Sequence, residues 1–309
     1  MRPLVLVLRA LGLGDFATGV PALRGLRRAY PAHEIVLAAP AALAPLVRAT
    51  GAVDRHLETP AYVREPMREV PWPHREPPAV AVNLHGRGPQ SHRALLALQP
   101  DRLLAFANPQ AGFLDGPMWT ADEHEVPRWC RMLSAYDIAA DPADLALAPP
   151  PAPAAPGAVL VHPGASGPER CWPVDRYAAV AAAVRAAGHP VLVTGSAAEV
   201  RLARAVAAAA DLPEDAVVAG RTDLAALAGM VAHARLVVCG DTGVAHLATA
   251  YGTPSVVLFG PMTPARWGPP PGRSRHVALW RGPAGLAGIT VAQVLAAAEQ
   301  AVGHAAATV

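Results

Sequence analysis

The sequence contains no lysine, and its 26 basic residues are all arginine. Without lysine the chain cannot carry a P-loop, because the G-x-x-x-x-G-K-[ST] motif requires one. The arginines are scattered along the chain and the formal net charge is only +2, so the charge pattern does not indicate a nucleic-acid partner. The abundance of Ala, Pro and Gly favours a GC-rich coding bias as the reason for the missing lysine.

Cysteine is also scarce. Cys130, Cys171 and Cys239 are far apart, odd in number and without C-x-x-C spacing, which argues against both a disulfide framework and a zinc site. We interpret them as reduced thiols. Neither D-x-D nor H-E-x-x-H occurs, and His124, between Glu123 and Glu125, is predicted to lie on a solvated charged stretch. The sequence therefore predicts no metal and no cofactor.

Long hydrophobic runs are missing, although 52% of the residues are hydrophobic. No apolar run approaches the roughly 20 residues that span a bilayer, and the most apolar stretch, 35–47, is interrupted by Pro40 and Pro45. The N-terminus lacks the charged-then-apolar layout of a signal peptide. We expect a soluble, cytoplasmic protein without a transmembrane segment, at most peripheral to a membrane.

A chain of 309 residues is long enough for two domains that each bury a core. Residues 148–157 read Ala-Pro-Pro-Pro-Ala-Pro-Ala-Ala-Pro-Gly, a composition typical of a stiff extended spacer. We therefore predict an N-terminal domain at 1–150 and a C-terminal domain at 158–309, with the last helix a candidate to pack back on the N-terminal domain.

Both halves alternate short apolar strands with amphipathic helices, the pattern of parallel α/β sheets. The proline-rich and charged stretch 59–78 is predicted to be a surface loop. The fold class is therefore α/β, with two facing Rossmann-like domains and a cleft between them. Strands are predicted at 3–8, 34–39, 79–84, 158–162, 190–194, 236–239 and 255–259, and helices at 21–30, 41–49, 91–97, 174–187, 198–209, 223–232, 244–251 and 291–302.

The strongest local signal is the sequence Gly240-Asp-Thr-Gly-Val-Ala-His246, where an apolar strand ends in a polar turn that starts a helix. Asp241 and Thr242 are good N-cap residues, and the free N–H groups beyond them can bind a phosphate or diphosphate. Taken alone, Asp241 could merely cap the helix and His246, one turn further on, could merely pack.

Two further strand ends support an anion site. The strand ending at His162 runs into small residues, with Arg170 close behind, and an arginine can hold two oxygens of a diphosphate and stabilise a leaving nucleotide. A solvated surface arginine is the competing interpretation. Glu199 lies in the first turn of another helix, where it can bind a ribose or simply cap.

Asp15 follows a glycine-rich turn after the first strand, which would direct its carboxylate into the cleft. A carboxylate there suits a general base, although a helix cap is the alternative. The turn, Gly12-Leu-Gly14-Asp-Phe-Ala17, lacks the third glycine of a dinucleotide fingerprint. Transfer of a sugar from a nucleotide diphosphate needs both a base and an anion site, and the chain offers both.

Several of these motifs together resemble the ADP-heptose lipopolysaccharide heptosyltransferases, glycosyltransferase family 9, of GT-B fold. The resemblance spans nearly the whole chain. It rests on Leu8-Arg-Ala-Leu-Gly-Leu-Gly-Asp15 with Pro21-Ala-Leu-Arg24, on His162-Pro-Gly-Ala-Ser166 with Arg170-Cys-Trp-Pro173, on 195–199, and on Asp241 to His246 with Phe259-Gly-Pro261. The family usually has lysine where Arg170 stands, and the acceptor half matches less closely.

The resemblance implies an inverting, metal-independent transfer of a heptose-type sugar from an ADP-activated donor to a hydroxyl of a glycan or small-molecule acceptor. It implies Asp15 as the catalytic base and Arg170 as the cation facing the diphosphate. The donor contacts it implies are Ser166, Glu199, Thr222, Asp241, Thr242, Gly243 and His246, and the acceptor candidates are Asn83, His85, Arg87 and Ser91. The alternatives are a GT-B epimerase or nucleotide-sugar hydrolase and a non-catalytic nucleotide-sugar-binding module.

Overall fold

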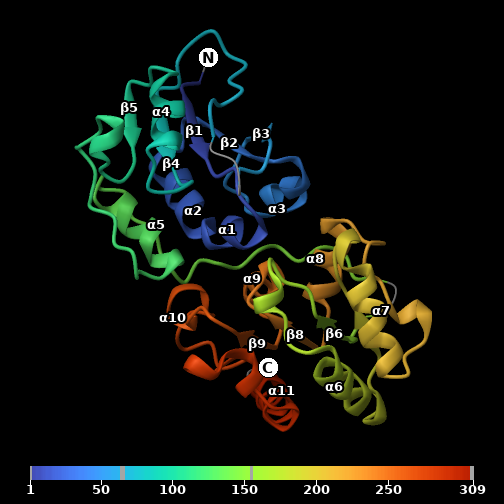
Figure 1. Ribbon diagram of the computed structural model, residues 1–309. Coiled ribbons are helices and arrows are strands. Elements are labelled where there is room, and N and C mark those ends of the chain that lie inside the picture. The colour runs from blue at the N-terminus through green and yellow to red at the C-terminus, as the bar shows by residue number, and fades with distance from the viewer. Residues whose placement is uncertain (1, 63–66, 154–155, 307–309) are drawn as a thin grey trace. The chain divides into compact units, whose positions relative to one another are not determined.

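The computed structural model describes residues 2–62, 67–153 and 156–306. The chain divides into two compact units, Met1–Leu145 and Ala146–Val309, which are described separately below (Figure 1).

The first unit is built on a parallel five-stranded sheet of order β3-β2-β1-β4-β5. In register, Leu8 at the end of β1 lies beside Ala38 of β2 and Asn83 of β4, so the carboxyl ends of these strands share one edge. The order reverses direction between β1 and β4, the kind of position where open α/β sheets bind ligands. The strands are β1 Leu4–Leu8, β2 Glu34–Pro40, β3 Arg55–Thr59, β4 Val80–Asn83 and β5 Arg102–Leu104.

Helices cover this sheet. The glycine turn after β1 leads directly into α1, so Asp15 lies in the first turn of a short helix rather than in a loop. The helices of the unit are α1 Leu13–Thr18, α2 Val20–Ala29, α3 Ala44–Ala49, α4 Gln90–Leu96 and α5 Glu125–Ser134.

The second unit repeats the plan with the order β10-β9-β8-β6-β7, all parallel. Here the order reverses between β6 and β8. The strands are β6 Val159–His162, β7 Val191–Val193, β8 Leu236–Gly240, β9 Ser255–Phe259 and β10 His276–Trp280. The helices are α6 Val174–Ala186, α7 Val200–Ala209, α8 Leu224–Ala232, α9 Gly243–Tyr251, α10 Pro264–Trp267 and α11 Val291–Ala306.

In the core of the second unit, residues that follow its first strand pack against residues near its last helix. Trp172 is fully buried, stands edge-on to Tyr177, and donates from its indole Nε1 to the carbonyl oxygen of Ile289 at 3.1 Å. Helix α11 packs on α6 and on strands β8, β9 and β10 of its own unit. Its packing against the N-terminal domain stays a prediction.

The predicted fold class, α/β with two parallel sheets, is confirmed. Among the strands and α-helices of the described residues, the prediction missed β3, β5, β10, α1, α5 and α10. The prediction of a solvated charged stretch around His124 is wrong. His124 caps α5 by accepting from the N–H of Val126, and Glu125 and Arg128 are only 5% and 1% exposed.

Within the described parts of the chain, no single helix is both long and apolar enough to cross a membrane. One pair of helical segments, 282–288 and 291–305, meets the length and composition requirements together but is bent by 92°.

Candidate functional site

In the second unit, the candidate donor residues gather at the carboxyl edge of the sheet. His162, the last residue of β6, pairs in register with Cys239 near the end of β8. The loops that follow these neighbouring strands carry Ser166 and Arg170 on one side and Asp241 and Thr242 on the other. This is where the strand order reverses, so the predicted convergence of the strand ends is observed in the fold.

Arg170 connects these two loops. Its guanidinium donates to Ser166 Oγ at 2.9 Å and to the Asp241 carbonyl oxygen at 3.0 Å, and it forms a salt bridge with the Asp241 carboxylate. Burial raises the pKa of the Asp241 carboxyl, and the contact with Arg170 opposes that rise. Arg170 is therefore an oriented cation and not a freely solvated side chain.

Helix α9 begins beside this ion pair. Thr242 is its N-cap and Gly243 its first residue, and the Thr242 hydroxyl is buried without a hydrogen-bond partner. An uncompensated buried hydroxyl and the open N–H groups of a helix start are both suited to an oxyanion. His246 lies one turn into α9, with its ring edge-on to Trp267 at 5.9 Å between centroids.

Glu199 bridges the ends of β6 and β7. Its carboxylate accepts from the N–H of Ser196 at 2.7 Å, in a capping box, and lies directly against Gly164. The absence of a side chain at Gly164 makes this close approach possible. His162 donates to or accepts from the Thr194 hydroxyl at 2.9 Å, and burial lowers the pKa of its imidazole while Glu199 raises it.

Beyond Glu199 lies a small recess. It has a volume of about 200 Å³, and its aliphatic walls are Ala197, Val200, Val217 and Ala219. The ion pair of Arg204 and Glu214 lines it as well. Arg221 also lines it, and half-buried Thr222 follows in the chain, just before the N-cap of α8. A recess with both aliphatic and charged walls is suited to a planar heterocycle, which has apolar faces and polar edges.

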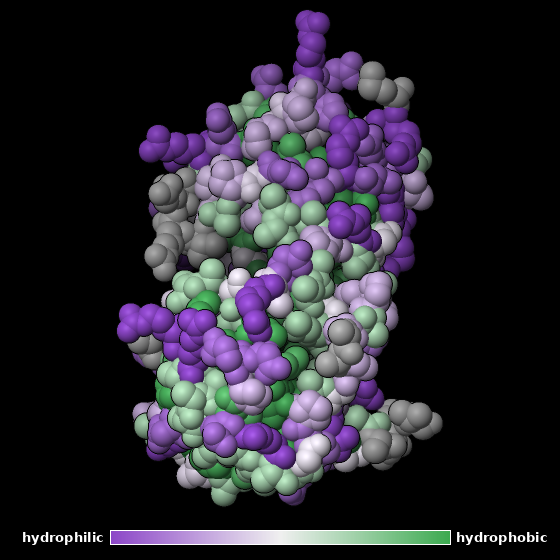
Figure 2. All heavy atoms as spheres, turned by 90° about the vertical axis from the view of Figure 1, so that its right-hand side faces the viewer, coloured by the Kyte–Doolittle hydropathy of each residue, from purple (hydrophilic) through white to green (hydrophobic). Residues whose placement is uncertain are grey.

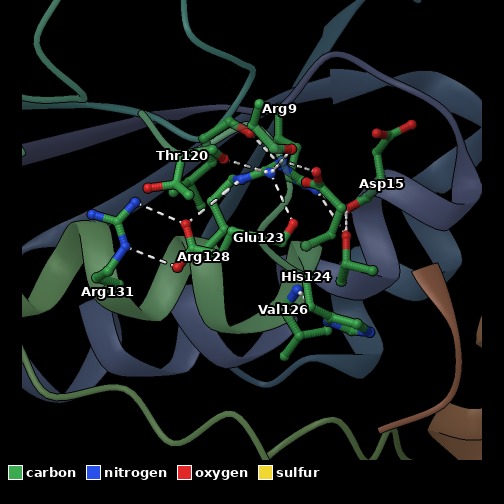
Figure 3. Close-up of polar contacts among 12 residues, drawn as sticks. Arg9, Asp15, Thr120, Glu123, His124, Val126, Arg128 and Arg131 are labelled. Carbon is green, nitrogen blue, oxygen red and sulfur yellow. Dashed lines mark hydrogen bonds and ion pairs between the residues drawn. The ribbon is translucent and has the colours of Figure 1, made fainter. Parts of the chain in front are cut away.

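In the first unit, Asp15 stands at the carboxyl edge of the sheet. Its main-chain carbonyl oxygen accepts from Arg9 Nε and from the Thr18 hydroxyl, the latter at 2.9 Å. Figure 3 shows the carboxylate pointing away from the Arg9 cluster. Burial raises the pKa of this carboxyl, while Arg9 and a hydrogen bond from the Gly12 backbone lower it. A carboxylate with a raised pKa has the chemistry of a general base.

The four acceptor candidates do not form one exposed group. Asn83 and Ser91 are buried, and Asn83 Nδ2 donates to Ser91 Oγ at 2.9 Å. The Asn83 side-chain oxygen accepts from the N–H of His85 at 3.0 Å, so this pair shapes the loop after β4. Arg87 is exposed in that loop. Contact with an acceptor stays a prediction for all four.

His85 has a polar atom with no partner. Its Nδ1 is buried without a hydrogen bond, and burial, reinforced by Arg9, lowers the pKa of the imidazole to about 4. Its ring is therefore neutral near pH 7 and free to donate or accept one hydrogen bond at this atom.

Sequence analysis missed a buried cationic cluster behind Asp15, shown in Figure 3. Arg9 lies over the Trp129 ring at 4.8 Å, and Arg128 lies over the Trp119 ring at 4.1 Å. The Arg128 guanidinium donates to the carbonyl oxygens of Thr120 and Ala121 at 3.0 Å and of Glu123 at 2.8 Å. The available signal for Arg9 was a charged residue directly after a buried strand.

Among the described residues, no three His, Cys, Asp or Glu side chains gather in an arrangement that could hold a metal ion.

Comparison with known proteins gives consistent matches. The sequence pattern of glycosyltransferase family 9 (heptosyltransferase) matches residues 130–284. Lipooligosaccharide heptosyltransferase 2 of Haemophilus influenzae is 33% identical over 108 residues, which are 33% of this chain and only 31% of that relative.

Two solved structures share the fold across almost the whole chain. A family 9 glycosyl transferase from Veillonella parvula superimposes with a TM-score of 0.81 at 18% identity, covering 98% of this chain and 97% of that one. The ADP-heptose lps heptosyltransferase II of E. coli gives 0.79 at 20% identity, covering 99% and 100%. The GT-B fold class is thereby confirmed. Because the family pattern matches half of the sequence, this chain belongs to glycosyltransferase family 9.

Proposed function

We propose that the protein is an inverting glycosyltransferase that moves a heptose-type sugar from an ADP-activated donor to a hydroxyl of a glycan or small-molecule acceptor. The reaction would need neither a metal nor another cofactor and would take place in the cytoplasm. The observation that carries the proposal is the oriented Arg170 beside the start of α9, where the loops after β6 and β8 meet. A cation and a helix start together form a diphosphate site.

The second unit holds the donor in this proposal. The diphosphate lies on Arg170, the Thr242 hydroxyl and the N–H groups that begin with Gly243, and Ser166 keeps Arg170 in place. Glu199 accepts hydrogen bonds from the ribose, and the adenine ring lies in the recess close to Thr222. His246, one turn into α9, faces the sugar side of the diphosphate. The shared fold of the E. coli ADP-heptose lps heptosyltransferase II supports ADP-heptose as the donor.

The first unit supplies the base. The acceptor hydroxyl oxygen attacks the anomeric carbon of the sugar, the bond from that carbon to the diphosphate oxygen breaks, and the proton passes to the Asp15 carboxylate. Attack opposite to the leaving group inverts the anomeric centre. Arg170 and the start of α9 stabilise the negative charge that develops on the departing ADP. His85 and Arg87 are the accessible candidates for holding the acceptor, with Asn83 and Ser91 shaping their loop.

Calorimetric titration with ADP, GDP, UDP and dTDP, without added metal, tests the donor. Selective binding of ADP would support the proposal, and a preference for another nucleotide would replace the donor. Asp15→Ala should abolish transfer while leaving ADP affinity nearly intact, and full transfer in that variant would contradict the role of Asp15. Donor consumption that is independent of any acceptor would instead favour an epimerase or hydrolase.

A further inference from the structure

Arg9 is a buried cation that the proposed reaction does not use. It follows strand β1 and is 1% exposed. Its guanidinium donates to three oxygens: the main-chain carbonyls of Asp15 and Leu84 and the hydroxyl of Thr18, the last at 2.9 Å (Figure 3). One side chain thus bonds to the helix that carries the Asp15 carboxylate and to Leu84, the residue that follows β4.

The surroundings of Arg9 fix its position. A Cβ atom at Gly19 would lie 2.8 Å from both Cδ and Nε of Arg9, so the side chain occupies the space that this glycine leaves open. On another side the Trp129 ring lies 4.8 Å from the guanidinium carbon. A planar guanidinium presents its N–H groups in a rigid fork, whereas an ammonium group has no such fork. Each of the three acceptors is reached by a different nitrogen of Arg9, and the single nitrogen of a lysine cannot occupy all three positions.

The bond to Leu84 has a consequence for the loop that follows. Leu84 precedes His85, whose N–H is held by Asn83, and Asn83 is held by Ser91. Arg9 therefore anchors the start of the loop 84–88 from one side while Asn83 anchors it from the other. The residues proposed for the acceptor extend from this anchored point.

We propose that Arg9 is a positioning residue, which holds the Asp15 helix and the acceptor loop 84–88 in a fixed relation through its two carbonyl hydrogen bonds. The inference rests on the proposed function, because it takes Asp15 as the base and 84–88 as the acceptor loop. Arg9 touches neither the carboxylate nor any reacting atom, so it acts through the backbone it holds and through its charge.

The charges around Arg9 support this role. Burial lowers the pKa of Arg9, Arg128 lowers it further, and Asp15 and Glu125 oppose both effects. In turn, Arg9 lowers the pKa of the Asp15 carboxyl against the effect of burial, and it helps to keep His85 neutral. Its charge therefore keeps the base ionised to a lower pH than burial alone would allow.

Two substitutions separate charge from geometry. Arg9→Lys keeps a cation but cannot make the three bonds, whereas Arg9→Met removes the charge. Arg131→Met is the control, since Arg131 belongs to the same cluster, donates to the Met118 carbonyl oxygen and lies over the Phe106 ring at 5.3 Å. It is not among the charges that act on Asp15 or Arg9, and its partly exposed side chain makes its removal a small loss of stability. The readouts are the Asp15 carboxyl titration by ¹³C NMR, assigned with Asp15→Asn, and the kinetics of transfer with separate kcat and acceptor KM.

Arg9→Lys is expected to lower kcat by about 10²-fold and to raise the acceptor KM, since a small misplacement of a catalytic group has this effect. Its Asp15 titration and ADP affinity should stay close to those of the unsubstituted protein. In Arg9→Met the Asp15 titration moves to higher pH, and in Arg131→Met it does not. Unchanged kcat in Arg9→Lys, or an unmoved Asp15 titration in folded Arg9→Met, overturns the proposal.

The two proposals can fail separately. If the unsubstituted protein transfers no sugar to any acceptor, the proposed function fails, and the Asp15 titration alone then decides whether Arg9 controls this carboxylate. If Arg9→Met does not fold, the separate changes in kcat and KM of Arg9→Lys decide the positioning role.

Discussion

The carboxylate of Glu199 lies so close to Gly164 that a methyl group on that glycine would overlap it. This contact joins the ends of β6 and β7 at the proposed ribose site. It makes the function of Glu199 testable without changing Glu199 itself.

Gly164→Ala should displace the Glu199 carboxylate and weaken ADP binding. The loss of a hydrogen bond to a charged group corresponds to about 1.5–3 kcal/mol, so we expect at least a roughly tenfold rise in Kd by calorimetry. Gly303→Ala is the matched control, since Gly303 lies in α11 with open space around its α-carbon. Equal affinity in both variants would show that Glu199 does not bind the donor.

Substitution of Arg170 tests the diphosphate site. Arg170→Met removes the cation and should raise the Kd for ADP by about 10- to 100-fold, because charge-assisted hydrogen bonds to the diphosphate are lost. Arg170→Lys introduces the residue that is usual in the family, and its Kd for ADP should lie between those of the unsubstituted protein and Arg170→Met. Arg185→Met serves as control, since Arg185 lies on α6 and pairs with the exposed Asp211. Unchanged ADP affinity in Arg170→Met would show that Arg170 does not bind the diphosphate.

The fold could be predicted where burial is continuous along the chain. Strands such as β1 and β8 are uniformly apolar because both faces of a parallel sheet are covered, and their sequences show it. Strand β3, Arg-His-Leu-Glu-Thr, lies at the sheet edge with partly exposed side chains, so nothing in its pattern distinguishes it from a loop. The three residues of β5 are too few for any periodicity.

The site could be predicted only in part, because the burial of the residues behind Asp15 depends on contacts with distant parts of the chain. Asp241, Thr242 and Asp15 follow strands directly, and topology alone brings such positions to one sheet edge. In contrast, Glu125 and Arg128 are buried because they pair with each other and because carbonyl oxygens surround Arg128. In the sequence, Glu125 and Arg128 stand close to a proline in a stretch of charged residues, a pattern that predicts exposed side chains. These side chains are buried because segments that are distant in the sequence pack around them.

Asp15→Asn should stabilise the protein at neutral pH while it abolishes transfer. Burial raises the pKa of the folded Asp15 carboxyl above its unfolded value. The contribution of this group to stability is therefore full below the unfolded pKa and is lost as the pH rises through the folded pKa. The neutral amide removes that cost, so Tm should rise at pH 7 and the difference should vanish in acid.

The same titration predicts the pH dependence of catalysis. The acid limb of kcat/KM should lie at a higher pH than the ordinary range of an aspartate, because the base must lose its proton to act. A stopped assay across the acid range measures it. An acid limb in the ordinary aspartate range would contradict the proposed effect of burial on the base.

The stability prediction has its own test. An equal Tm for Asp15→Asn and the unsubstituted protein at pH 7 would contradict it.

Arg128→Met should destabilise the first unit by about 3–5 kcal/mol, since it removes one partner of the buried ion pair between Glu125 and Arg128. Carbonyl oxygens of Thr120 and Ala121 also lose their donor. Arg131→Met provides the comparison on the same helix: Arg131 pairs with Glu123, but its side chain is 38% exposed, and solvent screening limits its contribution to about 1 kcal/mol. Urea unfolding followed by tryptophan fluorescence measures both. A similar small loss of stability in both variants would mean that the desolvation of the Glu125–Arg128 pair offsets the favourable free energy of its contacts. The cluster behind Asp15 would then contribute little to the stability of the unit.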